Sequence, residues 1–550
     1  MKQCLTLQKE GILSHVDLLF AQSVANEDSP MLLAACLFAL ARSGHLLLEL
    51  TEEGIHLAMQ QLGIEDASIP ALLREGAEKI SGTWLRRNGA CLYLQKNWVF
   101  ESKIIADLLR LIAAPVADFL AQPEISSVLN SEQSLAVKRA LEHPLSFLTG
   151  GPGTGKTFTA AQIVKTFLAQ TPQMRVLLTA PTGKAVAQLQ AGMRSLISDA
   201  VHIQAGTLHS LLGISSRQSS EEAQIPLVAD LIIVDECSMV DLYVFSKLLE
   251  KVASGTRLVL IGDRNQLPPV EAGSVFADVI ASQVFPCTEL TQVLRSDCQE
   301  ILSFAHLIKE GKAEEAIQTA AGADLKRVAL DFHAAGLWQQ CRHFFPGASL
   351  EQIDPLSALS GIKRFCLLSC IRKGPMGADA LNRFFLQQSL KGISQEQWWA
   401  APIMITRNND ELDLYNGDQG VLIRQVSAGH LTQLDVKDEA YFLDRSGGYR
   451  MVPALALPSF EYCYCLSVHK SQGSEYDEVF ILAPEGAESF GREVLYTAIT
   501  RARSKATLAV SDAVLRAAVT RSSRKTSGIQ ERLRSDLSKN SETRCLDSSV

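Results

Sequence analysis

Residues 146–157, SFLTGGPGTGKT, are the stretch of sequence that decides the fold. They begin as an apolar run, continue as a glycine-rich turn of the form GxxxxGK[ST], and lead into the helix-like segment FTAAQIVKTFL. This order predicts a phosphate-binding loop, because backbone N–H groups at the helix N-terminus converge on phosphate oxygens. We therefore expect ATP phosphates on the loop, Lys156 on the outer phosphates and Mg²⁺ on the Thr157 hydroxyl. The loop residues are Gly150, Gly151, Pro152, Gly153, Thr154, Gly155, Lys156 and Thr157.

Similar apolar runs recur along the chain. RVLLTAP, LIIVDE and RLVLIGD follow the first run, and helical segments separate them. A second series starts near Arg364 with RFCLLSC and continues with EYCYCLSVHKSQG, EVFILAP and ATLAVS. Continuous apolar runs that alternate with helices indicate a parallel sheet covered on both faces. The sequence thus predicts an α/β protein with two copies of one parallel-sheet architecture.

The remaining chain divides around these two series. Residues 1–121 read as a helical domain without a chemical motif, so we expect a partner-interaction domain. The first α/β domain is expected at residues 122–330 and the second at 331–534. Turn-rich, alternating segments at about residues 397–462 predict a small β insert in the second domain. The polar, serine-rich residues 535–550 predict a disordered tail.

Composition sets limits on the class of protein. With 550 residues, 47% hydrophobic and 20% charged, the chain resembles soluble globular proteins of several domains. A net charge of −8 argues against coating nucleic acid through bulk positive charge, although a local basic channel fits. The N-terminus lacks the layout of a signal peptide, and the apolar run Met31–Ala41 is too short for a membrane span. The 12 scattered cysteines favour reduced thiols in a cytoplasmic protein.

Paired acids end the run LIIVDE. A buried strand that ends in two carboxylates needs a reason, since unpaired buried charge is costly. We expect Asp235 on the Mg²⁺ side and Glu236 as the base that orients and deprotonates the attacking water. Gln266, in LIGDRNQLPPV, follows another strand at the crevice of an open sheet, so its amide is expected to sense the terminal phosphate.

The second series carries two further motifs, SVHKSQGSE at residues 467–475 and LYTAITRAR at residues 495–503. We expect Glu475 at the nucleotide and Arg501 as an arginine finger that reaches the nucleotide from the opposite domain. Such an arginine contributes about 10³–10⁵ in rate by stabilising charge on the transferred phosphoryl group.

Taken in order, the motifs resemble those of superfamily one helicases. LNSEQ resembles the adenine-reading motif, with Gln133 in that role, and TQVLRS resembles the motif whose arginine, Arg295, binds the γ-phosphate. TAPTGKA and TLH resemble the motifs that contact a DNA strand. The resemblance implies contacts to the phosphates of single-stranded DNA without base-specific readout. The residues expected in these contacts are Pro181, Thr182, Lys184, Thr207, His209, His469 and Lys470.

Finer matches resemble the RecD family of helicases: AGSVFADV, IRKGPMGADALN, VHKSQGSEYDEV and TSGIQERL, within a likeness from about residue 16 to 533. The resemblance implies two RecA-like motor domains, an SH3-like insert and ATP-dependent 5′-to-3′ translocation on single-stranded DNA. It also implies a heterotrimer with RecB and RecC that acts on duplex ends in double-strand break repair by homologous recombination and in DNA degradation. One departure is the polar segment at residues 213–230, where relatives carry a pin-like hairpin.

Three alternatives stay open. Asp435 and Lys437 form a D-x-K pattern with Asp418 before it, which is a weak nuclease signal because it falls in the β insert. A regulatory ATPase without fast unwinding is the second alternative, and intact Lys156, Glu236 and Arg501 weigh against it. A stand-alone RecD-like helicase is the third, and the N-terminal domain favours the complex instead.

Overall fold

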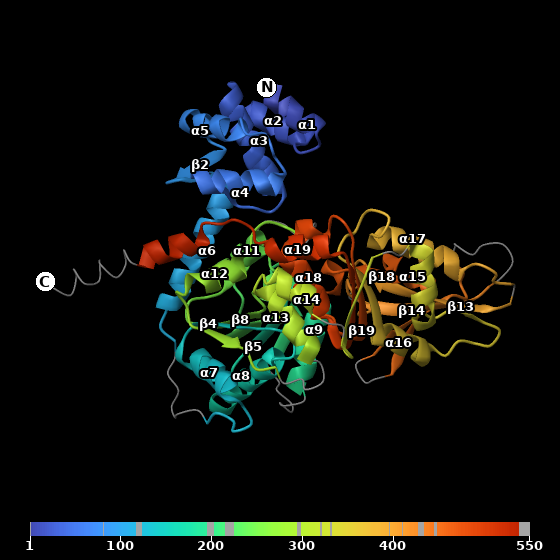
Figure 1. Cartoon of the computed structure of the whole chain (residues 1–550). Coiled ribbons are helices and arrows are strands. Elements are labelled where there is room, and N and C mark those ends of the chain that lie inside the picture. The colour runs from blue at the N-terminus through green and yellow to red at the C-terminus, as the bar shows by residue number, and fades with distance from the viewer. Residues whose placement is uncertain are drawn as a thin grey trace.

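The computed structural model describes the chain apart from residues 1, 81, 117–123, 195–202, 215–224, 294–298, 320–321, 331–332, 395, 410, 427–433, 445–447 and 538–550. A small N-terminal domain stands on the first α/β domain, and the second α/β domain lies beside the first (Figure 1). No helix within the described residues combines the length and the apolar character that a membrane crossing requires.

The N-terminal domain packs helices against a small antiparallel sheet of order β1-β3-β2. Its elements are α1 (Lys2–Lys9), α2 (His15–Val24), α3 (Asp28–Arg42), β1 (Leu47–Glu49), α4 (Glu52–Leu62), α5 (Ile69–Lys79), β2 (Leu85–Asn88) and β3 (Cys91–Leu94). Helix α3 is buried on nearly all sides, which explains its long apolar run. The sequence did not predict β2, because β2 buries Leu85 and exposes the three polar residues that follow.

Helix α6 (Gln95–Ala113) connects this domain to the first α/β domain. Its apolar face, with Ile104, Leu108 and Leu111, packs into the same core as Leu145 and Leu258 of the first α/β domain. By packing, α6 therefore belongs to the first α/β domain, although the sequence placed it in the N-terminal one.

The first α/β domain has a parallel sheet of order β6-β5-β7-β8-β4-β9. Apolar residues pack against both faces, which is why its strands read as continuous apolar runs. Its elements are α7 (Ser131–Glu142), β4 (Leu145–Gly150), α8 (Lys156–Gln170), β5 (Val176–Ala180), α9 (Gly183–Arg194), β6 (Ile203–Thr207), α10 (Leu208–Leu211), β7 (Leu231–Val234), α11 (Leu242–Lys251), β8 (Arg257–Gly262), α12 (Val275–Ser282) and β9 (Cys287–Leu290).

The second α/β domain has a parallel sheet of order β10-β20-β19-β12-β18, so the predicted fold class of two parallel-sheet domains is confirmed. Its elements are α13 (Gln299–Lys309), α14 (Ala313–Gln318), β10 (Leu325–Val328), α15 (Ala334–Cys341), α16 (Pro355–Arg364), β12 (Phe365–Ser369), α17 (Ala378–Ser389), β18 (Cys465–Ser467), β19 (Tyr476–Ala483), α18 (Gly491–Ile499), β20 (Ala502–Val510) and α19 (Asp512–Thr520).

The β insert is an antiparallel sheet of order β11-β13-β14-β15-β16, and β17 pairs with β13. Its strands are β11 (Ala348–Ser349), β13 (Trp398–Ile405), β14 (Gln419–Gln425), β15 (Glu439–Leu443), β16 (Tyr449–Pro453) and β17 (Phe460–Tyr462). Strand β11 lies well before the expected limits of the insert. It is two residues long, so no alternating pattern could announce it.

The segment after α19, which we call the C-terminal strap (residues 521–537), crosses back from the second α/β domain to the N-terminal domain and α6 (Figure 1). The carbonyl of Thr526 accepts a hydrogen bond from Leu46 N at 2.8 Å. Arg532 pairs with the buried Glu101 at 2.9 Å and lies 3.9 Å from the centroid of the Trp98 ring. Residues 529–537 are helical, which corrects the prediction of a disordered tail from residue 535; residues 538–550 lie outside the described residues.

Candidate nucleotide site and nucleic-acid interface

The phosphate loop connects the end of β4 to the start of α8. Gly153 and Gly155 adopt φ angles of 75° and 86°, a backbone conformation that side chains disfavour, so the loop needs glycine at both positions. The ammonium group of Lys156 donates to the carbonyls of Gly150 and Gly151, at 2.8 and 3.0 Å. Thr157 follows in the first turn of α8. The loop therefore gathers a cation, a hydroxyl and the N-terminus of a helix at one place, the arrangement that phosphate requires.

The acid pair follows β7, the strand that pairs with β5 in the same sheet. Glu236 has a left-handed backbone with φ of 53°, and its N–H donates to Asp235 Oδ1 at 2.8 Å. Burial, and then the charge of Glu236, raises the pKa of the Asp235 carboxyl, and the positive charge of Lys156 opposes this rise. Glu236 Oε2 is buried without a hydrogen-bond partner among the described residues. An orphaned carboxylate oxygen beside a cationic loop fits a base that acts on a water.

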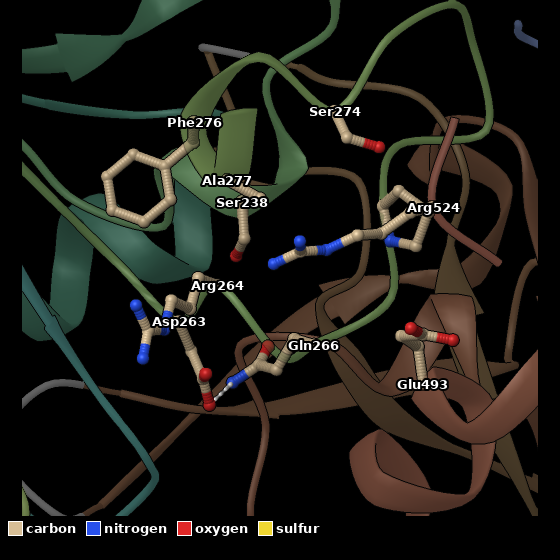
Figure 2. Close-up of a pocket in the computed structure, with 10 residues that line it drawn as sticks. Ser238, Asp263, Arg264, Gln266, Ser274, Phe276, Ala277, Glu493 and Arg524 are labelled. Atoms are coloured by element: carbon tan, nitrogen blue, oxygen red, sulfur yellow. Dashed lines mark hydrogen bonds between the residues drawn. The ribbon is translucent and has the colours of Figure 1, made fainter. Parts of the chain in front are cut away.

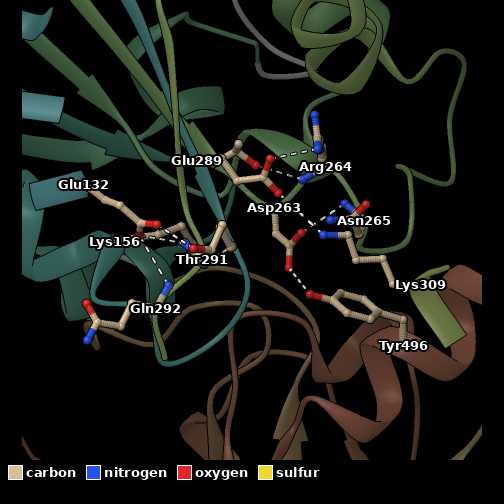
Figure 3. A network of polar contacts seen from close by, with 12 residues as sticks. Glu132, Lys156, Asp263, Arg264, Asn265, Glu289, Thr291, Gln292, Lys309 and Tyr496 are labelled. Carbon is tan, nitrogen blue, oxygen red and sulfur yellow. Dashed lines mark hydrogen bonds and ion pairs between the residues drawn. The ribbon is translucent and has the colours of Figure 1, made fainter. Parts of the chain in front are cut away.

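Gln133 lies at the start of α7, where its side chain and that of Asn130 form a reciprocal N-terminal cap. The amide is 2% exposed, and within the described residues its Nε2 has no hydrogen-bond partner. A buried, unpaired donor of this kind is available to the acceptor nitrogens of a base. The neighbouring Glu132 accepts from Thr291 N at 2.8 Å, which fixes the segment that leads to residue 294 (Figure 3). Arg295, expected at the γ-phosphate, lies outside the described residues.

A tyrosine from the second α/β domain contacts the first. We call the interface between the two α/β domains the seam. The hydroxyl of Tyr496, in α18, donates to Asp263 Oδ2 at 3.0 Å (Figure 3). A Cβ atom added to Gly151 would stand 3.1 Å from the same hydroxyl, so Tyr496 rests directly on the phosphate loop. Asp263 Oδ2 also accepts from Gln266 Nε2 at 3.4 Å, while Gln266 Oε1 is buried and unpaired among the described residues.

Sequence reasoning missed Tyr496, although it lies inside the quoted motif LYTAITRAR. The aromatic side chain in this motif was the available signal, but core packing explains such a residue equally well. Only its position against Gly151 and Asp263 distinguishes the two interpretations.

Arg501, the expected arginine finger, lies at the end of α18 and is 3% exposed. Its guanidinium group donates to the carbonyls of Thr497 and Ser474, at 2.9 and 3.2 Å. Burial, and then the carboxylate of Asp263, raise the pKa of the Tyr496 hydroxyl, and the charge of Arg501 opposes this rise. The structure thus brings Arg501 to the seam with its side chain turned toward its own domain. Glu475 instead pairs with Arg503, at 3.2 Å.

The expected DNA-contacting residues of the first α/β domain lie on the carboxyl side of β5 and β6. Lys184 Nζ donates to Ser474 Oγ of the second domain at 2.6 Å, and burial lowers the pKa of Lys184 to about 8. Thr182 Oγ1 accepts from Ala185 N at 3.2 Å, next to Pro181.

Two cavities flank this region. One, of about 500 Å³, is lined by Thr207 and His209, and the other, of about 440 Å³, is lined by Lys184. Tyr415, from the β insert, lines both cavities and packs its ring against Gly183. An aromatic ring between two polar cavities is the type of group on which a base stacks, and the sequence did not single it out.

His469 and Lys470 do not join these cavities. The ring of His469 packs edge-on against Phe490 at 6.0 Å, and burial lowers the pKa of His469. Lys470 forms an ion pair with Glu461 of β17. Both residues lie in the loop after β18, so a contact with DNA would require the ion pair of Lys470 to open.

The candidate nuclease residues do not form a metal site. Asp435 caps a turn by accepting from Lys437 N at 3.3 Å, while Asp418 accepts from Tyr415 N at 2.8 Å. Among the described residues there is no group of three or more histidine, cysteine, aspartate or glutamate side chains with the geometry to hold a metal ion.

Known proteins resemble this chain over most of its length. A family model described as an AAA domain matches residues 128–328, and one described as a UvrD-like helicase C-terminal domain matches residues 462–509. The RecBCD enzyme subunit RecD of Mycolicibacterium smegmatis is 35% identical, over 82% of this chain and 83% of its own length. The subunit of the same name from Mycobacterium tuberculosis is 33% identical, over 81% and 80%. The ATP-dependent RecD2 DNA helicase of Deinococcus radiodurans is 29% identical, over 90% of this chain and 67% of its own length.

The sequence identity to the two mycobacterial proteins extends over about four fifths of both chains and therefore beyond the two α/β domains. It agrees with the observed phosphate loop, which contacts a second domain through Tyr496. The chain belongs to the RecD family, and it is an ATP-dependent DNA helicase.

Proposed function

We propose that this helicase moves 5′ to 3′ along single-stranded DNA and hydrolyses ATP at the seam between its α/β domains. The observation that carries the proposal is Tyr496, which joins Asp263 and the phosphate loop to the second domain. A change of charge on the loop therefore acts directly on a contact between domains. Opening and closing of the seam, alternating between nucleotide states, would shift the grip on a strand in steps.

Each polar group at the seam has a role in this proposal. Lys156 binds the outer phosphates, Glu236 orients and deprotonates water, and Gln266 senses the terminal phosphate. Arg501, from the second domain, and Arg295, which precedes that domain in the sequence, supply positive charge to the transferred phosphoryl group. Arg501 must turn from the carbonyl groups of Thr497 and Ser474 to do so, which makes it a group that responds to closure.

The donor set of Thr157 and Asp235 fits Mg²⁺. Both offer oxygen ligands, and Mg²⁺ takes one or two protein oxygens together with phosphate oxygens and water. Burial, and then the charge of Glu236, raise the pKa of the Asp235 carboxyl, and a cation there would offset both effects. Bound Mg²⁺ would neutralise charge on the phosphates and orient them.

DNA is proposed to follow the two cavities that Tyr415 separates. Lys184, Thr182, Thr207 and His209 are the expected phosphate contacts from the first domain, and Tyr415 offers a ring for stacking. His469 and Lys470 would contact the strand only after domain movement, because Lys470 is paired with Glu461.

We further propose a cytoplasmic complex with RecB-type and RecC-type subunits that processes duplex ends. Support comes from the two mycobacterial relatives named as RecBCD subunits, which are 35% and 33% identical, whereas the RecD2 helicase is 29% identical. A stand-alone helicase is the second candidate. It is favoured by the fact that the RecD2 likeness extends over 90% of this chain.

One experiment tests the motor. Purified full chain is assayed for ATP hydrolysis with and without single-stranded DNA, beside Lys156→Ala. We expect hydrolysis that depends on DNA in the wild type and none above background in Lys156→Ala, which loses the hydrogen bonds to the carbonyls of Gly150 and Gly151. A thermal melt checks that this variant is folded. Turnover that persists in Lys156→Ala would show that the site is misassigned.

A second experiment tests direction and assembly. Duplexes with either a 5′ or a 3′ single-stranded tail are offered to the chain, alone and co-expressed with RecB-type and RecC-type chains from the same genome. Unwinding from the 5′ tail by the co-purified complex supports the first candidate. Robust unwinding by the chain alone, without association, supports the second.

A further inference from the structure

A cavity of about 200 Å³, distinct from the phosphate loop, lies where the two α/β domains meet the C-terminal strap. Four cations line it, one from each of four segments: Arg264 after β8, Lys309 in α13, Arg492 in α18 and Arg524 in the strap. We call these four residues the cationic pocket. A gathering of this kind is unexpected in a chain whose formal net charge is −8.

The acids near the cationic pocket do not neutralise it. Glu493 is the acid on its wall, and its carboxylate already accepts from Ser522 Oγ and Ser523 N, both at 2.8 Å. Arg264 and Lys309 share one carboxylate behind the wall, that of Glu289, at 2.8 and 3.5 Å. One carboxylate, that of Glu493, therefore stands among four cations in the lining of the pocket itself, while the carboxylates of Glu289, Asp263 and Asp278 lie outside that lining.

Two of the cations are poorly satisfied by protein. Nε of Arg492 is buried and has no hydrogen-bond partner among the described residues, and its Nη1 makes one long bond, 3.4 Å, to Lys309 O. Arg524 is exposed, and in Figure 2 its guanidinium group extends from the strap toward Ser238 and Asp263. An unpaired buried donor costs free energy, so a site that retains one beside three other cations is suited to an anion.

The cationic pocket is adjacent to the proposed hydrolysis site. Tyr496 forms part of its wall, and the hydroxyl of Tyr496 touches the phosphate loop on the other side, at Gly151. A smaller cavity, drawn in Figure 2, shares Arg264, Glu493 and Arg524 with the pocket and is bounded by Gln266. One aromatic side chain and one amide therefore separate the pocket from the place where the terminal phosphate is cleaved.

We propose that the cationic pocket binds inorganic phosphate after hydrolysis and holds it during release from the seam. The inference rests on the proposed nucleotide site. The volume agrees with it: drug-sized ligands need about 300–1,000 Å³, whereas a phosphate ion with a few waters, at about 30 Å³ per water, fits a smaller cavity. Since both α/β domains and the strap contribute cations, bound phosphate would hold the three segments together until it leaves.

The test is a titration of inorganic phosphate into the full chain saturated with ADP and Mg²⁺, which fill the diphosphate part of the phosphate loop. The γ-phosphate position stays open, and the substitutions of Arg524 and Arg492 distinguish the cationic pocket from it. Binding is measured by calorimetry in the wild type, in Arg524→Gln and in Arg492→Gln/Arg524→Gln. We expect saturable binding in the wild type and a dissociation constant about tenfold higher in Arg524→Gln, because one charge-assisted contact is lost. Arg524 is exposed, so this variant should fold normally even if the double variant does not.

The matched control is Arg516→Gln, which removes an exposed arginine of α19 that pairs with Glu314 at 2.6 Å, and phosphate binding should not change. Absence of saturable binding in the wild type, or equal binding in Arg524→Gln, would overturn the proposal. Displacement of phosphate by single-stranded DNA would also overturn it, since the pocket would then take a strand phosphate. Lys156→Ala separates the pocket proposal from the proposed motor function. If this variant loses ATP hydrolysis and still binds phosphate, both proposals are supported. If it loses ATP hydrolysis and no protein, wild type included, binds phosphate, the pocket proposal is rejected and the motor function stands.

Discussion

Polar groups on the proposed nucleotide side of the seam differ in hydrogen bonding from those on the proposed DNA side. On the nucleotide side, Nε2 of Gln133, Oε2 of Glu236 and Oε1 of Gln266 are buried without hydrogen-bond partners in the described part of the chain. On the DNA side, Lys184 and Lys470 are already bonded to Ser474 and Glu461. An unpaired buried polar atom costs about 1–3 kcal/mol. These three atoms on the nucleotide side are thus available to a ligand at once. Lys156 and Arg501 have to leave carbonyl groups first, as Lys184 and Lys470 on the proposed DNA side have to leave Ser474 and Glu461.

This difference predicts that substitutions on the nucleotide side reduce turnover strongly with little loss of stability. Glu236→Gln keeps the shape of the side chain and removes the base, so we expect ATP hydrolysis to fall by about 10²–10⁴. The free energy of unfolding should stay equal or rise, because the substitution removes a buried charge next to Asp235. Steady-state hydrolysis and thermal melting, with the exposed Glu310→Gln as control, measure both effects. Retention of a large share of wild-type turnover would contradict the role of Glu236.

Tyr496→Phe sharpens the comparison at the seam itself. The variant removes the hydroxyl that bonds to Asp263 and rests on Gly151, while it leaves the buried ring in place. We expect DNA-stimulated hydrolysis to fall about tenfold, in line with the loss of one buried hydrogen bond to a charged group. Tyr449→Phe, on the exposed strand β16, is the matched control and should hydrolyse ATP at the wild-type rate. Equal rates in the two variants would mean that the contact does not couple the domains.

On the DNA side, Tyr415→Ala should reduce affinity for single-stranded DNA by at least about fivefold, since stacking of one base contributes about 1–3 kcal/mol. Basal hydrolysis without DNA should be unaffected, because Tyr415 lines the two cavities and not the phosphate loop. Fluorescence anisotropy with a labelled oligonucleotide measures the affinity, and Tyr415→Phe should restore it. An unchanged affinity in Tyr415→Ala would place the strand elsewhere.

The smallest expected effect concerns Lys184. Burial lowers the pKa of its ammonium group to about 8, so the positive charge is present below that pH and is lost above it. We expect affinity for single-stranded DNA to fall about threefold between about pH 7 and about pH 9, the loss of one modest ionic contact. In Lys184→Met this component should disappear, and binding at the lower pH should equal that of the wild type at the higher pH. A pH dependence that is the same in both proteins would assign the titration to another group.

The features that the sequence predicted are those whose residues lie close together in the sequence or at the ends of apolar strands. Lys156 and Thr157 are in one loop after one apolar strand, and Asp235 and Glu236 end another, so strand order alone places them at one edge of a sheet. The two parallel-sheet domains were predictable for the same reason, because a strand buried on both faces shows as a continuous apolar run.

Contacts that join distant segments left no local pattern. The bond from Tyr496 to Asp263 spans 233 residues, and that from Lys184 to Ser474 spans 290. The inward turn of Arg501 was equally hidden, since it depends on carbonyl groups of its own domain. Strand β2 and the strap were missed because their residues are polar on the outside and are held by partners elsewhere in the chain.

The C-terminal strap has a mechanical consequence. Chain order runs from the N-terminal domain through the first and second α/β domains. The bond of Thr526 to Leu46 returns the strap to the N-terminal domain, and the ion pair of Arg532 with Glu101 joins the strap to α6 of the first α/β domain. The hydrogen bond of Thr526 thereby connects the end of the chain to the N-terminal domain, and domains connected at both ends can move relative to one another in fewer ways than domains connected in a linear series. When the seam opens, either the backbone of the short stretch before Thr526 changes conformation or the N-terminal domain moves with the strap. A stop codon near residue 525 would therefore remove the bond to the N-terminal domain, and it would also take Ile529 and Leu533 out of the core of the first α/β domain.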